Sequence, residues 1–111
     1  MAITQSQSVQ PASITNVAHG SYIDTGTVAA FTITCGFQPR YVKVVNTNAS
    51  GDVMIEWFEG MTANYGIKTA IDGTRSMITS LGITVSASGF TVGLDTDLVV
   101  TSEQLHWQAI G

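Results

Sequence analysis

The chain has 111 residues, a common size for one domain, so a second independent core is not expected. Only 11% of its residues are charged and its net charge is -4. Its four bases leave no positive stripe for phosphates, which excludes nucleic acid as an expected partner. No apolar run approaches the roughly 20 residues of a membrane-spanning helix, and no charged and apolar leader begins the chain. We therefore expect neither membrane insertion nor conventional export.

Hydroxyl side chains take the place of charge on the expected surface. The chain contains fifteen threonines and ten serines. Threonine is β-branched, so it suits a pleated and half-buried strand, while its hydroxyl still faces water. This composition favours a β-rich protein over a helical bundle.

The first part of the chain differs in composition from the rest. Residues 1–23 contain no Asp, Glu, Lys or Arg and only isolated aliphatic side chains. Such a segment buries too little apolar area to fold alone, so we expect it to lie against its own domain or a neighbouring subunit. We divide the chain into an extended N-terminal arm, residues 1–26, and a β-sandwich domain, residues 27–111. The interface candidates in the arm are Ile3, Val9, Ile14, Val17 and Tyr22.

From residue 27 onward, alternating apolar and polar residues separated by turn formers predict short strands. A dense run of turn formers at residues 46–52 predicts a hairpin between the strands on either side. Residues 59–66 are expected to form a loop with at most one helical turn. The fold class is thus all-β: one antiparallel β-sandwich or jelly roll of about eight short strands. The predicted strands cover residues 27–35, 41–46, 53–58, 67–71, 76–79, 83–86, 89–94, 98–101 and 105–110.

Cys35 is the only cysteine, which excludes an intrachain disulfide and a thiol-rich metal site. Phe31 and Ile33 precede it at steps of two residues, so Cys35 is expected to point inward as a small hydrophobe. The fold must then be held by packing alone.

Candidate chemistry is sparse. Asp95 and Asp97 resemble a pair of calcium ligands, but calcium needs six to eight oxygens, and a plain turn explains the pair better. Glu56 and Glu59 could in principle act as a glycosidase pair, yet their spacing at a strand end does not aim them at one point. We predict no catalytic, cofactor-binding or metal-ligating residue, and no enzymatic activity.

Aromatic and apolar side chains are the more informative candidates. The strand at residues 53–58 carries an aromatic on each face, Trp57 and Phe58. These rings could form a subunit interface or a platform on which a sugar stacks. His106 alternates with Leu105 and Trp107, so it is expected at a surface or interface. The interface candidates of the domain are Trp57, Phe58, Met61, Tyr65 and His106.

Two stretches resemble a pattern of small structural proteins of tailed bacteriophages. They are Gly-Phe-Gln-Pro-Arg-Tyr-Val-Lys-Val-Val-Asn at residues 36–46 and Met-Ile-Glu-Trp-Phe-Glu-Gly-Met at residues 54–61. Gly-Ile-Thr-Val-Ser at 82–86 and Gly-Phe-Thr-Val-Gly at 89–93 fit the same pattern, and the resemblance spans residues 31–111. It implies a head decoration or cement subunit, often a homotrimer, that binds the major capsid protein on the outer capsid surface of the virion. Such a protein would be assembled in the host cytoplasm.

A second resemblance points to another function. Pro39, Val42 and Val44, followed by the strands at residues 82–86 and 89–93, are similar to the H-type lectin sandwich. That resemblance implies a trimeric, tail- or fibre-associated module that binds a glycan. The chain shows no match to the sugar-contacting positions of that family.

Overall fold

The computed structural model describes residues 16–48 and 53–111. These residues form eight strands, all paired antiparallel in one sheet of order β1-β8-β3-β4-β5-β6-β7-β2. They form no helix, so no helix of the described part is long and apolar enough to cross a membrane. The predicted all-β antiparallel fold is confirmed. The strands are β1 (Val17–Ile23), β2 (Phe31–Thr34), β3 (Tyr41–Asn46), β4 (Met54–Phe58), β5 (Tyr65–Thr69), β6 (Arg75–Ser86), β7 (Gly89–Val92) and β8 (Gln104–Ile110).

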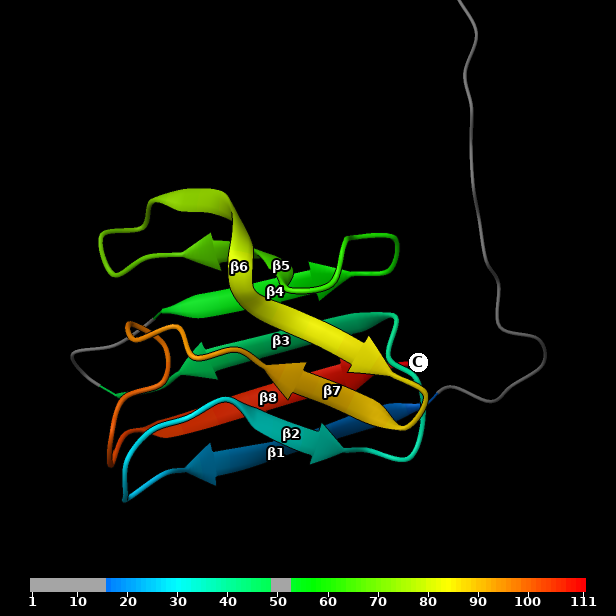
Figure 1. The fold of residues 1–111 in the computed structure, drawn as a ribbon, viewed down its shortest axis with the longest axis horizontal. Helices are drawn as coiled ribbons and strands as arrows, with labels where there is room; N and C mark the ends of the chain where they lie inside the picture. Colours follow the sequence, from blue (N-terminus) through cyan, green and yellow to red (C-terminus); the bar gives the residue numbers. More distant parts are fainter. Residues whose placement is uncertain (1–15, 49–52) are drawn as a thin grey trace, which may run out of the picture.

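The sheet curls over itself because β6 belongs to both of its layers. The first half of this twelve-residue strand pairs with β5, and the second half pairs with β7. The bend falls at Leu81, whose φ of 61° is left-handed, and at Gly82, where a Cβ would collide with the carbonyl of Tyr65. As a result, β7 and β2 lie in front of β8 and β1 (Figure 1). The two layers are therefore parts of one half-barrel.

The core fills the space between these layers. Tyr22 and Phe31 stack with ring centroids 3.9 Å apart, which joins the two ends of the sheet, β1 and β2. Phe90 meets Trp107 edge to face at 5.5 Å, which joins β7 to β8. Aromatic pairs at such distances stabilise a core beyond simple burial. The buried apolar residues are Phe31, Val42, Val44, Val53, Ile55, Trp57, Ile83, Phe90, Val92, Leu98, Val99, Leu105 and Ala109.

The segment between β7 and β8 closes one end of the half-barrel. Leu98 and Val99 are buried there although neither belongs to a strand. The fully buried Asn46 donates through Nδ2 to the carbonyl of Leu98 at 3.1 Å and to Oε1 of Glu103 at 2.8 Å. Its Oδ1 accepts from the backbone N–H of Asn48 at 2.9 Å. One amide side chain thus fastens this segment to β3.

Several sequence-based boundaries need correction. The predicted strand at residues 98–101 is wrong: these residues form turns that are held by Asp95 and Asn46. The strands predicted at 76–79 and 83–86 are one bent strand. The strand expected at 27–35 is shorter, Phe31–Thr34, and β5 begins earlier than predicted, at Tyr65. Residues 59–64 form turns without a helix.

Part of the segment predicted as an N-terminal arm belongs to the sheet, and residues 1–15 of that segment lie outside the described residues. Val17–Ile23 forms β1, which pairs along its whole length with β8, so the folded domain includes part of the segment assigned to the arm. The predicted hairpin between β3 and β4 is present, although residues 49–52 of its turn lie outside the described residues. Cys35 packs against the core, as predicted, with its Sγ 3.4 Å from the carbonyl oxygen of Phe37.

Candidate interaction surface

The outer face of strands β1, β8, β3 and β4 carries a row of apolar side chains. Strand pairing places Val17 beside Ile110, Ile110 beside Tyr41, and Tyr41 beside Phe58. We call these four residues the apolar row. Val17 is 50% exposed and Phe58 is 44% exposed, and the other two are half-buried. Alternation forces this arrangement, because Val42, Val44 and Trp57 on the same strands fill the core.

Tyr41 anchors the apolar row to a polar cluster beside it. The Tyr41 and Phe58 rings lie 5.2 Å apart at an angle of 57°. The Tyr41 hydroxyl donates to Oε2 of Glu56 at 2.6 Å, and Arg75 lies 3.5 Å from the other carboxylate oxygen. The pKa of Tyr41 is raised well above its ordinary value. Burial is the largest cause, followed by the hydrogen bond from the hydroxyl to Glu56 and the charge of that carboxylate. The phenol of Tyr41 therefore stays neutral to a higher pH than that of an exposed tyrosine.

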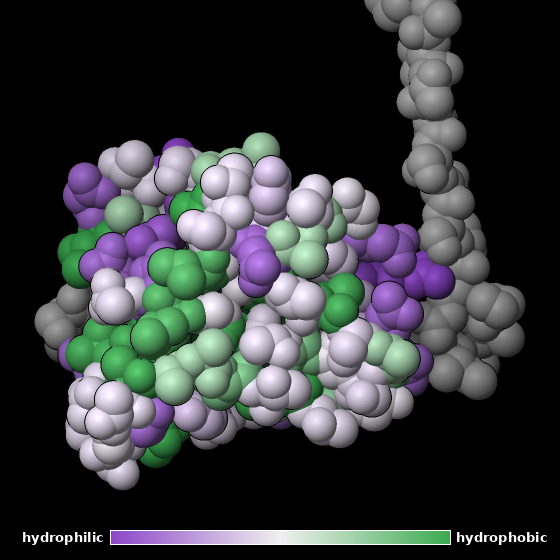
Figure 2. All heavy atoms as spheres, viewed as in Figure 1, coloured by the Kyte–Doolittle hydropathy of each residue, from purple (hydrophilic) through white to green (hydrophobic). Residues whose placement is uncertain are grey.

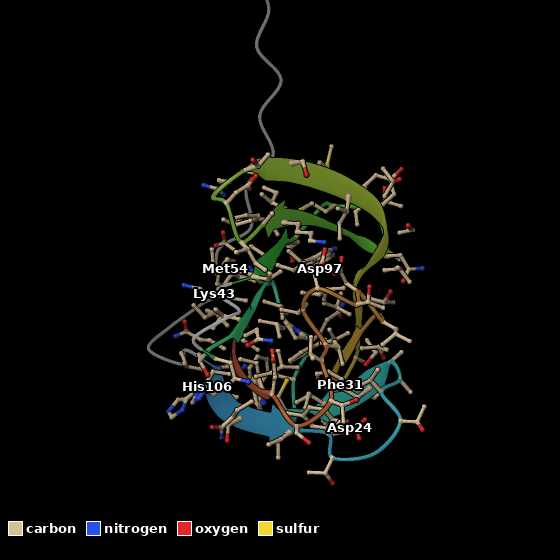
Figure 3. The ribbon with its side chains drawn as sticks, turned by 90° about the vertical axis from the view of Figure 1, so that its left-hand side faces the viewer. Asp24, Phe31, Lys43, Met54, Asp97 and His106 are labelled. Atoms are coloured by element: carbon tan, nitrogen blue, oxygen red, sulfur yellow. The ribbon has the colours of Figure 1, made fainter. Side chains whose placement is uncertain are left out.

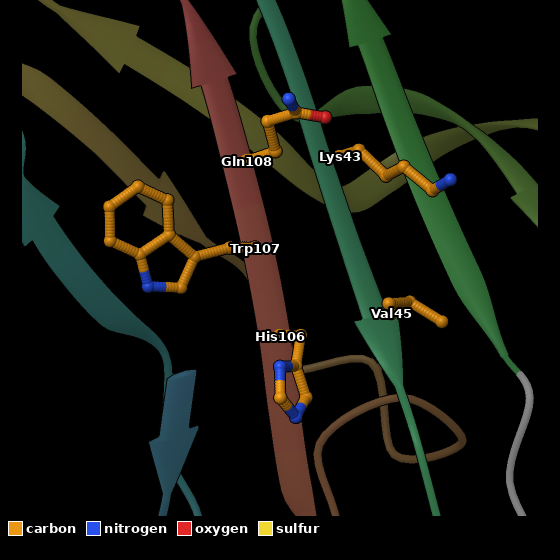
Figure 4. Close-up of a pocket in the computed structure, with 5 residues that line it drawn as sticks. All are labelled: Lys43, Val45, His106, Trp107 and Gln108. Carbon is orange, nitrogen blue, oxygen red and sulfur yellow. The ribbon is translucent and has the colours of Figure 1, made fainter. Parts of the chain in front are cut away.

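Next to the apolar row, the same face has an open depression of about 200 Å³ between β3 and β8 (Figure 4). Lys43, Val45, His106 and Gln108 line it, together with Trp107. The Trp107 indole points to the opposite side of β8, where it packs on Phe90. The depression therefore offers polar groups and the His106 imidazole, but no indole, phenol or phenyl face on which a ligand could stack.

In Figure 3, Lys43, Met54 and His106 lie along one side of the molecule, and Asp24, Phe31 and Asp97 lie toward the other. The side formed by β6, β7 and β2 faces the viewer in Figure 2, where pale residues of intermediate hydropathy cover much of these strands. Pairing brings Thr84, Thr91 and Thr32 into one row there, with the hydroxyls of Thr91 and Thr32 2.9 Å apart. Threonine thus lines these three strands, whereas green apolar residues gather on the left of the same view, over the segment between β7 and β8 (Figure 2).

The two carboxylates predicted to form a turn do so, and they also hold a lysine. Asp95 Oδ1 accepts from the backbone N–H groups of Asp97 at 3.0 Å and Leu98 at 3.3 Å. Lys68 Nζ lies 2.9 Å from Asp95 Oδ2 and 2.8 Å from Asp97 Oδ2. Burial by itself would lower the pKa of Lys68, but its hydrogen bonds to Asp97 and Asp95 and their charges outweigh burial and raise it. The ammonium occupies the place between the carboxylates that a cation would need.

Other titratable groups do not converge. Glu56 pairs with Tyr41 and Arg75, whereas Glu59 lies 3.6 Å from Arg40, so the two glutamates have different partners. Within residues 16–48 and 53–111, no group of three His, Cys, Asp or Glu side chains is arranged to hold a metal ion.

The structure separates the predicted interface candidates by exposure. Val17, Phe58 and His106 are exposed on the outer face of the sheet, whereas Met61 and Tyr65 are half-buried. Tyr22 points inward onto Phe31. Ile3, Val9 and Ile14 lie outside the described residues.

Trp57 requires a correction. It is only 5% exposed and belongs to the core, so it offers no surface for a subunit or a sugar. Alternation showed that Trp57 and Phe58 face opposite ways, but the larger indole is the ring that turns inward. Its Nε1 lies 3.4 Å from the carbonyl oxygen of Thr62.

Sequence reasoning did not select Tyr41 and Ile110 as interface candidates. Each looks like an ordinary strand residue, and their contribution arises because strands distant in sequence lie side by side. The register of the β3–β4 hairpin, which pairs Tyr41 with Phe58, was the one signal that could have revealed part of the row. Ile71, at 64% exposed, is a further apolar surface residue in the turn between β5 and β6.

Comparison with family models, with curated proteins and with solved structures finds no match to this chain.

Proposed function

We propose that this chain is a structural subunit that binds protein through the apolar row, in the role of a decoration or cement subunit on the outer capsid surface of a tailed bacteriophage. Its partner is the major capsid protein of the same virion. The observation that carries the proposal is the row itself, which joins two exposed side chains, Val17 and Phe58, to the half-buried Ile110 and Tyr41 across four strands. Contiguous exposed apolar side chains mark interaction surfaces.

The surroundings of the row support a protein partner. Protein interfaces have an apolar centre depleted in charge and a polar rim. Here Glu56, already paired with Tyr41 and Arg75, and the side chains of Lys43 and Gln108 border the apolar row. Because the contact is made mainly by shape and apolar burial, its affinity should fall only weakly with added salt.

Carbohydrate binding by a tail- or fibre-associated, lectin-like module is the second candidate function. The depression supports it, because Lys43, His106 and Gln108 can hydrogen-bond to hydroxyl groups. Its one aromatic ring is the His106 imidazole, since the Trp107 indole lies on the inner side of the sheet. For this reason the apolar row favours the protein-binding function.

Rebinding to particles stripped of the protein tests both candidates. Phe58→Ser should weaken rebinding at least about tenfold, since it removes an aromatic anchor of the row. Ile71→Ser is the matched control, because Ile71 is even more exposed but follows β5 beyond the Met54 end of β4, whereas Phe58 is at the other end of that strand. Both variants should keep the wild-type melting temperature within a few degrees. Rebound wild-type protein should also raise the resistance of the shells to heat.

The lectin candidate makes the opposite prediction. Rebinding that a simple sugar abolishes, that His106→Ala weakens and that Phe58→Ser leaves unchanged would refute the cement proposal. Rebinding that persists at high salt and in the presence of sugar would support it.

A further inference from the structure

Strand β1 ends the sheet on one side and pairs only with β8 among the described residues. The direction of its backbone groups follows from one contact: Gly111 N–H donates to the carbonyl of Asn16 at 2.8 Å, so Asn16 faces β8. Backbone groups alternate between the two edges of a strand. The residues that direct N–H and C=O away from β8 are therefore Val17, His19, Ser21 and Ile23.

Among residues 16–48 and 53–111, nothing protects this edge against pairing with another strand. Natural edge strands are blunted by Lys, Pro, bulges or very short length. Val17–Ile23 is seven residues long, holds no Pro and no Asp, Glu, Lys or Arg, and keeps an unbroken register with β8. Within residues 16–48 and 53–111, no hydrogen bond joins its outward backbone groups to another segment. The edge therefore has about eight backbone groups ready to pair, four donors and four acceptors.

The sequence of the strand is complementary to itself about Gly20. In an antiparallel pairing of two copies centred on Gly20, Val17 lies opposite Ile23 of the second copy, and His19 lies opposite Ser21. In this register, the residues whose N–H and C=O groups point away from β8 lie opposite one another. The two strands can therefore form backbone hydrogen bonds along their whole length. Val17 and Ile23 are each 50% exposed on the same face, so each would cover the other. A two-fold interface requires this kind of self-complementary surface.

We propose that two copies of this chain pair edge to edge through β1, antiparallel and centred on Gly20, so that their two sheets become continuous. The two-fold axis runs perpendicular to the sheet at Gly20 and leaves both apolar rows on the same side of the dimer. The proposal does not depend on the proposed function, because it uses the strand edge. Only Val17 belongs to both surfaces, and Phe58 is three strands away.

Charge at the two ends of β1 tests the register. We compare the wild-type chain with Val17→Lys/Ile23→Lys and with Val17→Glu/Ile23→Glu by native mass spectrometry and sedimentation equilibrium. The wild type should be a dimer, and each double variant should dissociate with a Kd raised at least about tenfold, since like charges directly opposite each other repel. Mixing the two variants should restore a 1:1 heterodimer, because every lysine then faces a glutamate. Ile71→Lys/Met77→Lys, at exposed positions away from β1, should remain a dimer.

Two further measurements make the proposal independent of those variants. The amides of His19 and Ser21 should be protected from hydrogen exchange in the wild type and exchange freely in the dissociated variants. His19→Pro removes an outward N–H and no bond to β8, so it should give a folded monomer.

Four outcomes would overturn the proposal. The first is a wild-type monomer at all concentrations whose His19 and Ser21 amides exchange freely. The second is a monomer in which these amides are protected, because the chain's own residues 1–15 would then cover the edge. The third is a trimer that the β1 variants leave intact, as the phage and lectin resemblances imply. The fourth is a dimer whose oppositely charged variants fail to form a heterodimer.

Discussion

Asn46 provides the sharpest test of how the end of the half-barrel is closed. Asn46→Ala removes the hydrogen bonds to Leu98, Glu103 and Asn48 in one step. Each such bond contributes about 1 kcal/mol, and leaving the buried carbonyl of Leu98 without its donor adds a similar amount. We expect the free energy of unfolding to fall by about 4 kcal/mol and the melting temperature to fall by roughly 15 °C.

The assay is urea unfolding followed by tryptophan fluorescence, at one fixed protein concentration so that dimer formation does not differ between samples. Thr47→Ala is the control: Thr47 directly follows Asn46, and its Oγ1 donates to the carbonyl of Gln104 at 3.3 Å, but on the exposed side. We expect it to change the free energy of unfolding by less than about 0.5 kcal/mol. If Asn46→Ala were no more destabilising than this control, the argument that Asn46 fastens the segment between β7 and β8 would be wrong.

Three further predictions concern the surface and the bend. Lys68→Met leaves Asp95 without its ammonium partner and should destabilise the fold by about 2 kcal/mol at neutral pH in urea unfolding. Folding raises the pKa of Lys68, so its ion pairs stabilise the fold fully below its ordinary pKa of 10.5, and this stabilisation is lost as pH rises through the higher pKa of the folded state. The difference in free energy of unfolding between Lys68→Met and the wild type should therefore shrink in alkali. A difference that stays the same would contradict this. Of the three tyrosines, Tyr41 should ionise at the highest pH in an ultraviolet titration, and Tyr41→Phe should abolish that step. The same substitution should destabilise the fold by about 1 kcal/mol, because it removes the hydrogen bond to Glu56. Persistence of the step in Tyr41→Phe would disprove the role given to this hydrogen bond. Leu81→Gly should leave the stability in thermal unfolding unchanged or raise it by up to about 1 kcal/mol, because the left-handed backbone at the bend of β6 suits glycine. A large loss of stability would show that the contacts of the Leu81 side chain outweigh its backbone strain.

Local pattern was enough to predict the fold class and the central strands. Residues 41–46 and 105–110 alternate clearly, and the structure shows Val42, Val44, Leu105 and Ala109 in the core as that pattern requires. The turn formers at residues 46–52 correctly predicted the hairpin. These features depend on neighbours within a few residues, which is why they can be read without the fold.

The alternation of apolar and polar residues did not predict a strand where the two faces of that strand differ little in hydrophobicity. In Val17–Ile23 the inward residues are Ala18, Gly20 and Tyr22, which are not more apolar than the outward ones. The strand forms because β8 offers a free edge and because Gly20 leaves room for the Trp107 ring, within 3 Å of where a Cβ would lie. Both causes come from residues about ninety positions away.

The opposite error occurred at residues 98–101, where an apolar run looked like a strand. Leu98 and Val99 are indeed buried, but Asp95 and Asn46 take their backbone groups into turns. Burial follows from composition, whereas the choice between strand and turn depends on which hydrogen-bonding partners the fold brings near.

The candidate surfaces were the least accessible to sequence reasoning. The chain alone showed that charge is scarce and that the strand at residues 53–58 carries an aromatic side chain on each face. Only the tertiary structure decided that Trp57 is inside and Phe58 outside, and that Val17, Ile110 and Tyr41 join Phe58 in one row. The reason is physical: a surface is made of side chains from strands that neighbour one another in the sheet, and the order of strands is set by the packing of the whole core.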